Sequence, residues 1–249
     1  MASSKLRLDL LMVERGLAPS RQQARALIMA GKVQVDTCCV DKPGTLIFDS
    51  SDIVVKGEVL PYVSRGGLKL EAALKEMALS VKDLICMDVG ASTGGFTDCL
   101  LQHGAARVYA VDVGYGQLAW KLRQDRRVVV IERTNIRFMD ASAVPEPVDM
   151  ATIDASFISL KTVVPPVLDF MAPEGRILAL IKPQFEAGKG KVGKGGVVRD
   201  PEQRRTIIEE LVRFFESRGL QCGPVIRSPL LGPKGNQEYI ILLTKTDAV

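Results

Sequence analysis

A glycine-rich turn near residue 90 is the first segment whose residues could do chemistry. The surrounding stretch reads DLICMDVGASTGGFTDCLLQHG over residues 83–104. Its apolar run breaks at Gly90, and an apolar helical pattern resumes at Phe96, which predicts a buried strand, a tight turn and a helix. Glycines let a ligand approach the backbone, and a helix start presents free N–H donors. The turn is therefore predicted to cradle a nucleotide-like molecule.

A second apolar run, RVYAVDV over residues 107–113, contains Asp112 near its end. An acidic residue about 20 positions after such a turn is placed to accept hydrogen bonds from a ribose diol. The turn reads GASTGG and not GxGxxG, and Asp88 lies beside it. A carboxylate there repels a pyrophosphate but suits a ligand that carries ammonium and sulfonium groups. S-adenosylmethionine therefore fits these residues better than a dinucleotide does.

Two charged residues close later apolar runs. Asp154 follows VDMATI and Lys182 follows RILALI. Parallel strands deliver such side chains to a ligand crevice, and charged groups there are more often functional than structural. Asn135 follows a third run, VVVIERT, and is placed to meet an adenine edge.

The elements that must position these residues alternate between short apolar runs and helical stretches. This alternation predicts a largely parallel, doubly wound α/β sheet. Two final runs, CGPVIRSPL and QEYIILLTK, predict a closing antiparallel pair, with Glu238 at the start of the last strand. The amphipathic helix SRGGLKLEAALKEM has a predicted cap at Ser64 and carries Lys69, which by itself is typical of a surface lysine.

Residues 1–59 are predicted to form a separate small domain. Helices are expected over residues 5–15 and from the predicted cap Ser20 to Gly31, and short strands over 33–35 and 52–57. No acidic residue occurs between Arg15 and Val35. A basic helical face is the electrostatic footprint of RNA binding, and a solvated face is the alternative. The basic residues in question are Arg7, Arg15, Arg21, Arg25 and Lys32.

The loop EAGKGKVGKGGVVRD over residues 186–200 is also basic. It contains Lys189, Lys191 and Lys194 among five glycines. We interpret it as a mobile lid over a phosphate-bearing substrate, and a flexible solvated loop is an equally open alternative.

The composition is ordinary for a soluble globular protein, with 47% hydrophobic and 25% charged residues and a net charge of +4. Five cysteines without a CxxC pair and a single histidine argue against a zinc site or a disulfide framework, so no metal is expected. The sequence shows neither a signal peptide nor a membrane span, and we expect a cytoplasmic protein, with a monomer favoured.

Several ordered motifs resemble known families. The stretch LDLLMVERGLAPSRQQARALIMAGKVQVD resembles the small RNA-binding domain named after ribosomal protein S4. The opening SRGGLKL and the turn DVGASTGGF resemble the FtsJ-type ribose methyltransferases. Together with IDASFISL, KPQFEAG and VGKGGVVRDP, the chain resembles the TlyA family, also called hemolysin A, from about residue 5 to 245.

The TlyA resemblance implies an S-adenosylmethionine-dependent cytidine 2′-O-methyltransferase that acts on ribosomal RNA. It implies a Rossmann-like domain with a mostly parallel seven-stranded sheet over residues 64–249, joined by a linker over 60–63. A catalytic quartet is then expected: Lys69, Asp154, Lys182 and Glu238. Because a free lysine with a pKa of about 10.4 is protonated at neutral pH, Lys182 must lose its proton to act as the base, or else stabilise the alkoxide.

The same resemblance assigns residues to the cofactor and to RNA. The implied cofactor site comprises Ser64, Arg65, Gly66, Gly67, Asp88, Gly90, Ala91, Ser92, Thr93, Gly94, Gly95, Phe96, Asp112, Val113 and Asn135. Arg133 and Arg137 are expected to hold RNA phosphates. Phe157 is expected either to stack on a nucleotide turned out of its RNA helix or to be a core phenylalanine.

One departure from the family concerns the linker. Members often carry Arg-x-Trp-Val where this chain has Leu60, Pro61, Tyr62 and Val63, so a coupling that depends on that arginine and tryptophan is in doubt. Large-subunit RNA is the favoured substrate, and small-subunit activity is left open. The alternatives are a nicotinamide-dependent oxidoreductase on the same fold, a non-catalytic RNA-binding or ribosome-assembly factor, and a membrane-lytic protein. No apolar span in the sequence supports the last of these.

Overall fold

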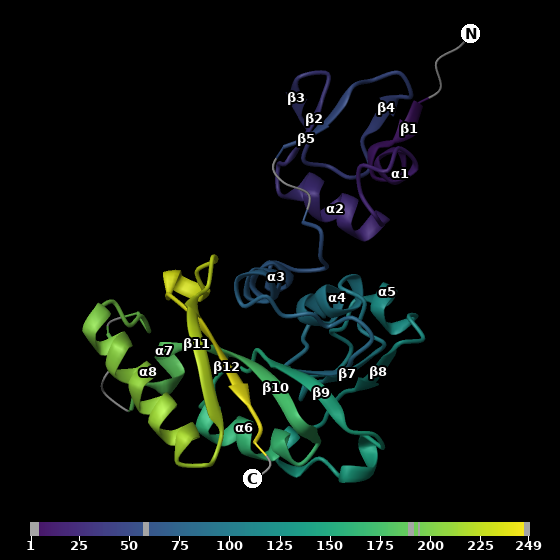
Figure 1. Cartoon of the computed structure of the whole chain (residues 1–249). Coiled ribbons are helices and arrows are strands. Elements are labelled where there is room, and N and C mark those ends of the chain that lie inside the picture. The colour runs from purple at the N-terminus through teal and green to yellow at the C-terminus, as the bar shows by residue number, and fades with distance from the viewer. Residues whose placement is uncertain (1–4, 57–59, 189–191, 194, 247–249) are drawn as a thin grey trace. The chain divides into compact units, whose positions relative to one another are not determined.

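The computed structural model describes residues 5–56, 60–188, 192–193 and 195–246 of the 249-residue chain. The chain divides into two compact units, residues 1–61 and 62–249. Each unit has its own hydrophobic core. The helices and strands of both units are labelled in Figure 1.

Two helices and two small antiparallel sheets make up the first unit. The helices are α1 (Leu8–Glu14) and α2 (Arg21–Met29). Strand β1 (Lys5–Arg7) pairs with β4 (Leu46–Phe48), and β2 (Val33–Val35) lies between β3 (Cys38–Cys39) and β5 (Ile53–Val55). Its core combines apolar side chains of the two helices, such as Leu8, Leu11 and Ile28, with strand residues such as Val33 and Ile47.

The first helix starts later than predicted. Residues 5–7 form β1, with Lys5 opposite Phe48, and the helix begins only at Leu8. Three residues with one apolar side chain fit the periods of both a strand and a helix, so pairing with β4 decides between them. The predicted cap of the second helix is confirmed, because Ser20 Oγ accepts a hydrogen bond from the Gln23 N–H at 3.2 Å.

The second unit is built on a seven-stranded sheet in the order β11-β12-β10-β9-β6-β7-β8. Strands β6 to β10 run parallel, and β12 is antiparallel to both β10 and β11. The predicted fold and the closing antiparallel pair are thus confirmed. The strands are β6 (Ile85–Val89), β7 (Arg107–Val111), β8 (Val128–Ile131), β9 (Val148–Ile153), β10 (Met171–Ile181), β11 (Gln221–Arg227) and β12 (Tyr239–Thr244).

Helices cover both faces of this sheet (Figure 1). Helices α3 (Gly66–Glu76) and α4 (Gly95–Gln102) pack on one face, and α6 (Leu160–Leu168) and α8 (Pro201–Glu216) on the other. Each buried strand contributes alternate side chains to the two cores. The remaining short elements are α5 (Trp120–Arg123), α7 (Pro183–Glu186), η1 (Ile136–Phe138), η2 (Ala141–Ala143) and η3 (Pro233–Gly235). Among the described residues, no helix is long and apolar enough to cross a membrane.

The strand order places a crevice beside β6. The chain passes from β6 to β7 on one side and later returns to β9 on the other, so the direction of winding changes between β6 and β9. In open α/β sheets, ligands bind outside the carboxyl ends of the strands at such a switch point. Gly90 directly follows β6, and Asp154 directly follows β9.

Candidate active site

The glycine turn after β6 has a backbone that only glycine fits at two positions. Gly90 has φ +84°, and a Cβ there would lie 2.9 Å from the Asp154 carbonyl oxygen. Gly94 has φ +92°, and a Cβ there would lie 2.2 Å from Leu122 Cδ1. Both positions combine a left-handed backbone with a lack of space, so any side chain would deform the turn.

Asp112 ties the end of β7 to this turn. Its Oδ2 accepts a hydrogen bond from the Ser92 N–H, and its Oδ1 accepts one from the Gly114 N–H, both at 2.7 Å. Each carboxylate oxygen can accept a further hydrogen bond. The position therefore suits the predicted contact with a ribose diol.

Asp88 lies beneath the turn and is fully buried. Its Oδ2 accepts hydrogen bonds from the Thr97 N–H at 2.9 Å and Thr97 Oγ1 at 2.7 Å, and its Oδ1 accepts one from Thr152 Oγ1 at 3.2 Å. Burial raises the pKa of Asp88 to about 7, although the hydrogen bonds from Thr97 oppose the shift. Since the side chain points under the start of α4 and does not line the cavity, its place does not support the predicted contact with a cofactor.

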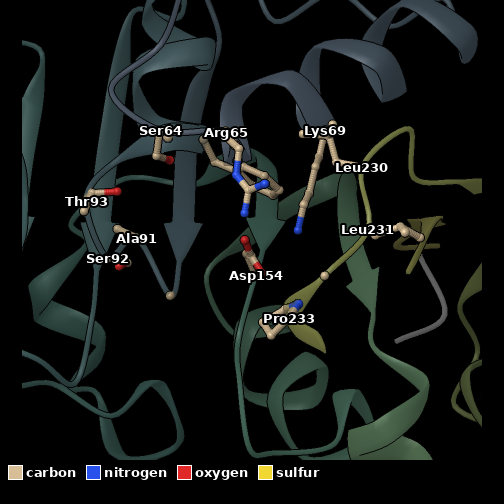
Figure 2. A pocket seen from close by; sticks show the side chains of 15 residues that line it. Ser64, Arg65, Lys69, Ala91, Ser92, Thr93, Asp154, Leu230, Leu231 and Pro233 are labelled. Carbon is tan, nitrogen blue, oxygen red and sulfur yellow. The ribbon is translucent and has the colours of Figure 1, made fainter. Parts of the chain in front are cut away.

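A cavity of about 440 Å³ opens between the glycine turn and the start of α3 (Figure 2). Arg65, Lys69 and Asp154 point into it. The predicted site residues that line it are Ser64, Arg65, Gly66, Lys69, Gly90, Ala91, Ser92, Thr93, Gly95, Phe96 and Asp154. Sequence reasoning missed the opposite wall, residues 230–233, which comes from the connection between β11 and β12. The only local signal for that wall was the Gly232–Pro233 pair.

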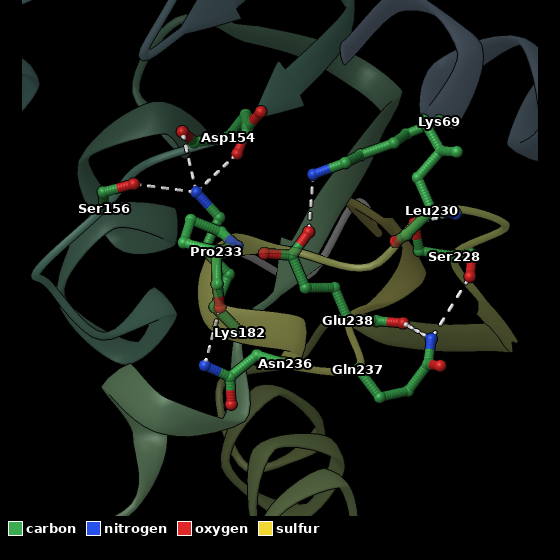
Figure 3. A network of polar contacts seen from close by, with 10 residues as sticks. All are labelled: Lys69, Asp154, Ser156, Lys182, Ser228, Leu230, Pro233, Asn236, Gln237 and Glu238. Atoms are coloured by element: carbon green, nitrogen blue, oxygen red, sulfur yellow. Dashed lines mark hydrogen bonds and ion pairs between the residues drawn. The ribbon is translucent and has the colours of Figure 1, made fainter. Parts of the chain in front are cut away.

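The four predicted catalytic residues form two lysine–carboxylate pairs (Figure 3). Lys69 Nζ lies 2.5 Å from Glu238 Oε2, and Lys182 Nζ lies 2.5 Å from Asp154 Oδ1. Asp154 and Lys182 follow neighbouring strands, whereas α3 and β12 bring Lys69 to Glu238. The structure thus brings each of these lysines to a carboxylate, and the catalytic role of the four residues stays a prediction.

Both pairs are largely withdrawn from solvent. The Glu238 side chain is fully buried, and the Lys182 side chain is 8% exposed. Buried ion pairs contribute little net stability because desolvation offsets their attraction, so two of them beside a cavity indicate a chemical role. Within the described part of the chain, Glu238 Oε1 is buried without a hydrogen-bond partner, and a Cβ at Gly232 would lie 2.0 Å from it.

Several residues predicted for the cofactor do not line the cavity. Gly67 packs against Tyr62, and Gly94 packs against Leu118 and Leu122. Asn135 Oδ1 accepts a hydrogen bond from the Arg137 N–H at 3.1 Å and caps η1.

Val113 is another residue predicted for the cofactor that does not line the cavity, and it is 70% exposed. Asp112 does not line the cavity either. It contacts the glycine turn through the hydrogen bond that it accepts from the Ser92 N–H. The strand ends predicted where Asp112 and Asn135 lie in the sheet, but local hydrogen bonds decide where their side chains point.

Phe157 is 89% exposed, so the alternative of a core phenylalanine is wrong. Its ring lies 5.0 Å from that of Phe185. Two arginines predicted to contact RNA stack on exposed rings: Arg133 lies 4.1 Å from the centre of Tyr115, and Arg137 lies 5.1 Å from that of Phe138. Sequence reasoning missed these two rings: Tyr115 lies between two glycines, and Phe138 ends η1 directly after Arg137.

The basic residues of the first unit divide into two groups. Arg25 and Lys32 are exposed, and Arg15 donates a hydrogen bond to the Ser51 carbonyl oxygen at 2.7 Å. Arg7 and Arg21 both bind the carboxylate of Asp9, at 3.0 and 2.9 Å, and the hydrogen bond from Arg7 is the main cause that lowers the pKa of Asp9 to about 2. Some of the predicted RNA-binding residues therefore also hold the fold.

The predicted basic lid is only partly described. Lys189, Lys191 and Lys194 lie outside the described residues. Beyond them, the Asn236 side chain holds residues 196–198, since its Nδ2 donates to the Gly196 carbonyl oxygen at 3.0 Å and its Oδ1 accepts from the Val198 N–H at 3.2 Å.

The doubly wound sheet, the glycine turn, the acid after β7 and the two lysine–carboxylate pairs define an enzyme of the Rossmann-like methyltransferase class. Residues 62–245 match the family model described as FtsJ-like methyltransferase, and residues 6–53 match the S4 domain. The chain belongs to the FtsJ-like methyltransferases and, within them, to the family named TlyA.

Three relatives illustrate the similarity. A candidate rRNA methyltransferase of Bacillus subtilis, YqxC, is 51% identical, covering 98% of this chain and 87% of that protein. The 16S/23S rRNA (cytidine-2′-O)-methyltransferase TlyA of Mycobacterium tuberculosis is 49% identical over 98% of this chain and 91% of its own. The solved structure of a candidate hemolysin from Streptococcus thermophilus is 44% identical, with a TM-score of 0.76, covering 99% and 90% of the two chains.

Proposed function

We propose that this enzyme transfers a methyl group from S-adenosylmethionine to the ribose 2′-hydroxyl of a cytidine in ribosomal RNA. The observation that carries the proposal is the pair of lysine–carboxylate contacts at the cavity, Lys182 with Asp154 and Lys69 with Glu238. A ribose hydroxyl is a poor nucleophile that must lose its proton during attack, so it needs a positioned base or a cation beside the forming alkoxide.

The residues at the cavity fit S-adenosylmethionine. The turn over residues 90–95 offers backbone approach at its glycines beside the small side chains of Ala91, Ser92 and Thr93. Asp112 does not line the cavity, but it binds the backbone of this turn and can accept a further hydrogen bond. The volume of about 440 Å³ lies within the range of small-molecule sites. When bound, this cofactor supplies an electrophilic methyl group on a positively charged sulfur. Ser64 and Arg65 also line the cavity, and Ser64 lies beside Gly95 of the turn.

The two lysines hold and move protons at the nucleophile. Lys182 places an ammonium group against Asp154, where it can stabilise the forming alkoxide, and only a Lys182 that has first lost its proton could accept the hydroxyl proton. Lys69 adds a second positive charge close to the same space, and Glu238 fixes its direction. These positive charges favour an oxyanion over the neutral hydroxyl.

Ribosomal RNA is the proposed substrate because of the S4 domain and the relatives. Residues 6–53 match a domain whose exposed Arg25 and Lys32 can neutralise phosphates. The relative from Mycobacterium tuberculosis is named for action on both 16S and 23S RNA, and it aligns over nearly the whole chain. We propose large-subunit RNA as a substrate and treat small-subunit RNA as the second outcome of the test.

The test is transfer of labelled methyl from S-adenosylmethionine to separated small and large ribosomal subunits that lack the modification. Wild type is compared with Lys182→Ala and with Lys75→Ala, which removes an exposed lysine from α3. We expect 2′-O-methylcytidine with wild type and Lys75→Ala, and a loss of at least about 100-fold with Lys182→Ala.

The labelled subunit identifies the RNA that is modified. Label that persists in Lys182→Ala would remove Lys182 from the mechanism. No label from wild type on either subunit or on free ribosomal RNA would support a non-catalytic RNA-binding protein instead. Binding of NAD in preference to S-adenosylmethionine would support an oxidoreductase.

A further inference from the structure

The turn that follows β9 surrounds the ammonium group of Lys182 (Figure 3). Lys182 Nζ forms the ion pair with Asp154 Oδ1, and it donates hydrogen bonds to Ser156 Oγ at 2.9 Å and to the Asp154 carbonyl oxygen at 3.4 Å. A lysine ammonium has three donors, so this turn offers an acceptor to each, and the longest contact is the weakest. The position of the turn therefore fixes where the ammonium group of Lys182 lies, and a substrate oxygen that approaches it must share or displace one of these contacts.

Glu186 fastens the far end of the same turn. Its Oε2 accepts a hydrogen bond from Ser159 Oγ at 2.6 Å, and its Oε1 accepts one from the Leu160 N–H at 2.8 Å. A carboxylate that binds the first N–H groups of a helix gains from charge assistance and from the helix dipole. Glu186 ends α7, which starts directly after Lys182, so one short segment both supplies the lysine and holds the turn around it.

The middle of the turn is exposed, and the ring of Phe157 contacts that of Phe185 in α7. Phe157 has φ +64° and is 89% exposed. A bulky residue in the left-handed region is strained and persists only where the surrounding structure maintains it. Lys182 binds residues 154–156 at one end of the turn, and Glu186 binds residues 159–160 at the other. These contacts provide that restraint.

We propose that Glu186 is a positioning residue for methyl transfer, because its grip on Ser159 and Leu160 keeps Ser156 and Asp154 in place around Lys182 Nζ. This inference rests on the proposed function, since it concerns the same lysine–carboxylate pair. Glu186 does not line the cavity. Its loss should therefore act on kcat and leave the affinity for S-adenosylmethionine unchanged.

The experiment compares wild type with Glu186→Ala, Glu186→Gln and Ser156→Ala in methyl transfer to unmodified ribosomal subunits. We expect Glu186→Ala and Ser156→Ala to lower kcat about tenfold, while the KM for S-adenosylmethionine stays within about twofold of the wild-type value. Glu186→Gln should stay within about threefold of wild type, because its amide can accept from the Leu160 N–H and donate to Ser159 Oγ. Ser156→Ala removes one acceptor without touching the start of α6, so it tests the same arrangement independently of that helix.

Asp200→Ala is the matched control. Asp200 is the N-cap residue of α8, where its carboxylate accepts the Glu202 N–H at 3.0 Å, so it holds the start of a helix other than α6. We expect this variant to lose some thermal stability and keep its kcat. The inference is overturned if Glu186→Ala or Ser156→Ala turns over like wild type, if Glu186→Gln is as slow as Glu186→Ala, or if Asp200→Ala is equally slow. Absence of transfer by wild type would overturn the proposed function and this inference together, whereas a normal wild type with normal variants would overturn only this inference.

Discussion

At the scale of single residues, Asp88 shows how the site is supported from below. Its carboxylate binds Thr97 and Thr152 in a fully buried place under the glycine turn, and burial raises its pKa to about 7. An aspartate in an unfolded chain has a pKa of about 3.9. The folded state therefore favours the protonated form, so the free energy of unfolding falls as pH rises from about 4 to about 7.

Asp88→Asn should remove this pH dependence. An asparagine can accept from Thr97 and donate to Thr152, so its neutral side chain fits the same contacts. The raised pKa corresponds to up to about 4 kcal/mol, and the difference in free energy of unfolding between the variant and wild type should grow in favour of the variant between pH 4 and 7. Urea unfolding followed by circular dichroism measures this difference.

Asp140→Asn is the control for that measurement, because hydrogen bonds from Ser142 lower the pKa of Asp140. For Asp140→Asn, the difference from wild type in free energy of unfolding should stay constant between pH 4 and 7 or change in the opposite direction. A constant difference between Asp88→Asn and wild type across pH 4 to 7 would contradict the account of Asp88.

At the scale of elements, the connection between β11 and β12 forms one wall of the cavity, and the glycine turn forms another. Gly232 lies in this wall, against the carboxylate of Glu238, and its φ of −74° is open to any residue. The need for glycine here is therefore space and not backbone conformation.

Gly232→Ala should separate Glu238 from Lys69. The added Cβ would lie 2.0 Å from Glu238 Oε1, so the carboxylate must move. We expect kcat to fall about tenfold or more, and affinity for S-adenosylmethionine to weaken, measured by methyl transfer and by calorimetry. Gly188→Ala, with nothing within 4 Å of the new Cβ, is the control and should behave like wild type. An equally active Gly232→Ala would show that the Lys69–Glu238 contact is not required.

Strand ends were the best guide to the site from sequence alone. Asp154 and Lys182 follow strands β9 and β10, and parallel neighbouring strands bring their carboxyl ends to one edge, so their meeting could be predicted. The wall over residues 230–233 could not, because it depends on how an antiparallel pair packs across the sheet. The Ser156 and Glu186 contacts likewise depend on the turn after β9, whose left-handed Phe157 no local pattern indicates.

At the scale of the whole molecule, the two units carry different parts of the proposed function. The second unit contains the cavity, both lysine–carboxylate pairs and two hydrophobic clusters of its own. The first unit contains exposed basic residues on a helical scaffold. We propose that the first unit supplies affinity for RNA and the second supplies the chemistry.

A chain that starts at Tyr62 tests this division. Its affinity for S-adenosylmethionine should equal that of the full chain, since the cavity is lined by residues 64–233 only. Its affinity for ribosomal RNA should fall, and the dependence of that affinity on salt should weaken as phosphate contacts are lost. The full chain with Arg25→Ala and Lys32→Ala together should show part of the same loss. Reduced affinity of the shortened chain for S-adenosylmethionine would contradict the division.

The place of β12 in the sheet has a consequence for synthesis of the enzyme. This strand follows all the others along the chain, yet it lies between β10 and β11, and Glu238 directly precedes it. Since a ribosome releases a chain from its N-terminus, the free edge of β10 stays open until β12 leaves the exit tunnel. Glu238 can reach Lys69, 169 positions earlier, only after that insertion. The Lys69–Glu238 contact is therefore among the last contacts of the site to form, after the residues of the glycine turn and of the Lys182–Asp154 pair have left the ribosome.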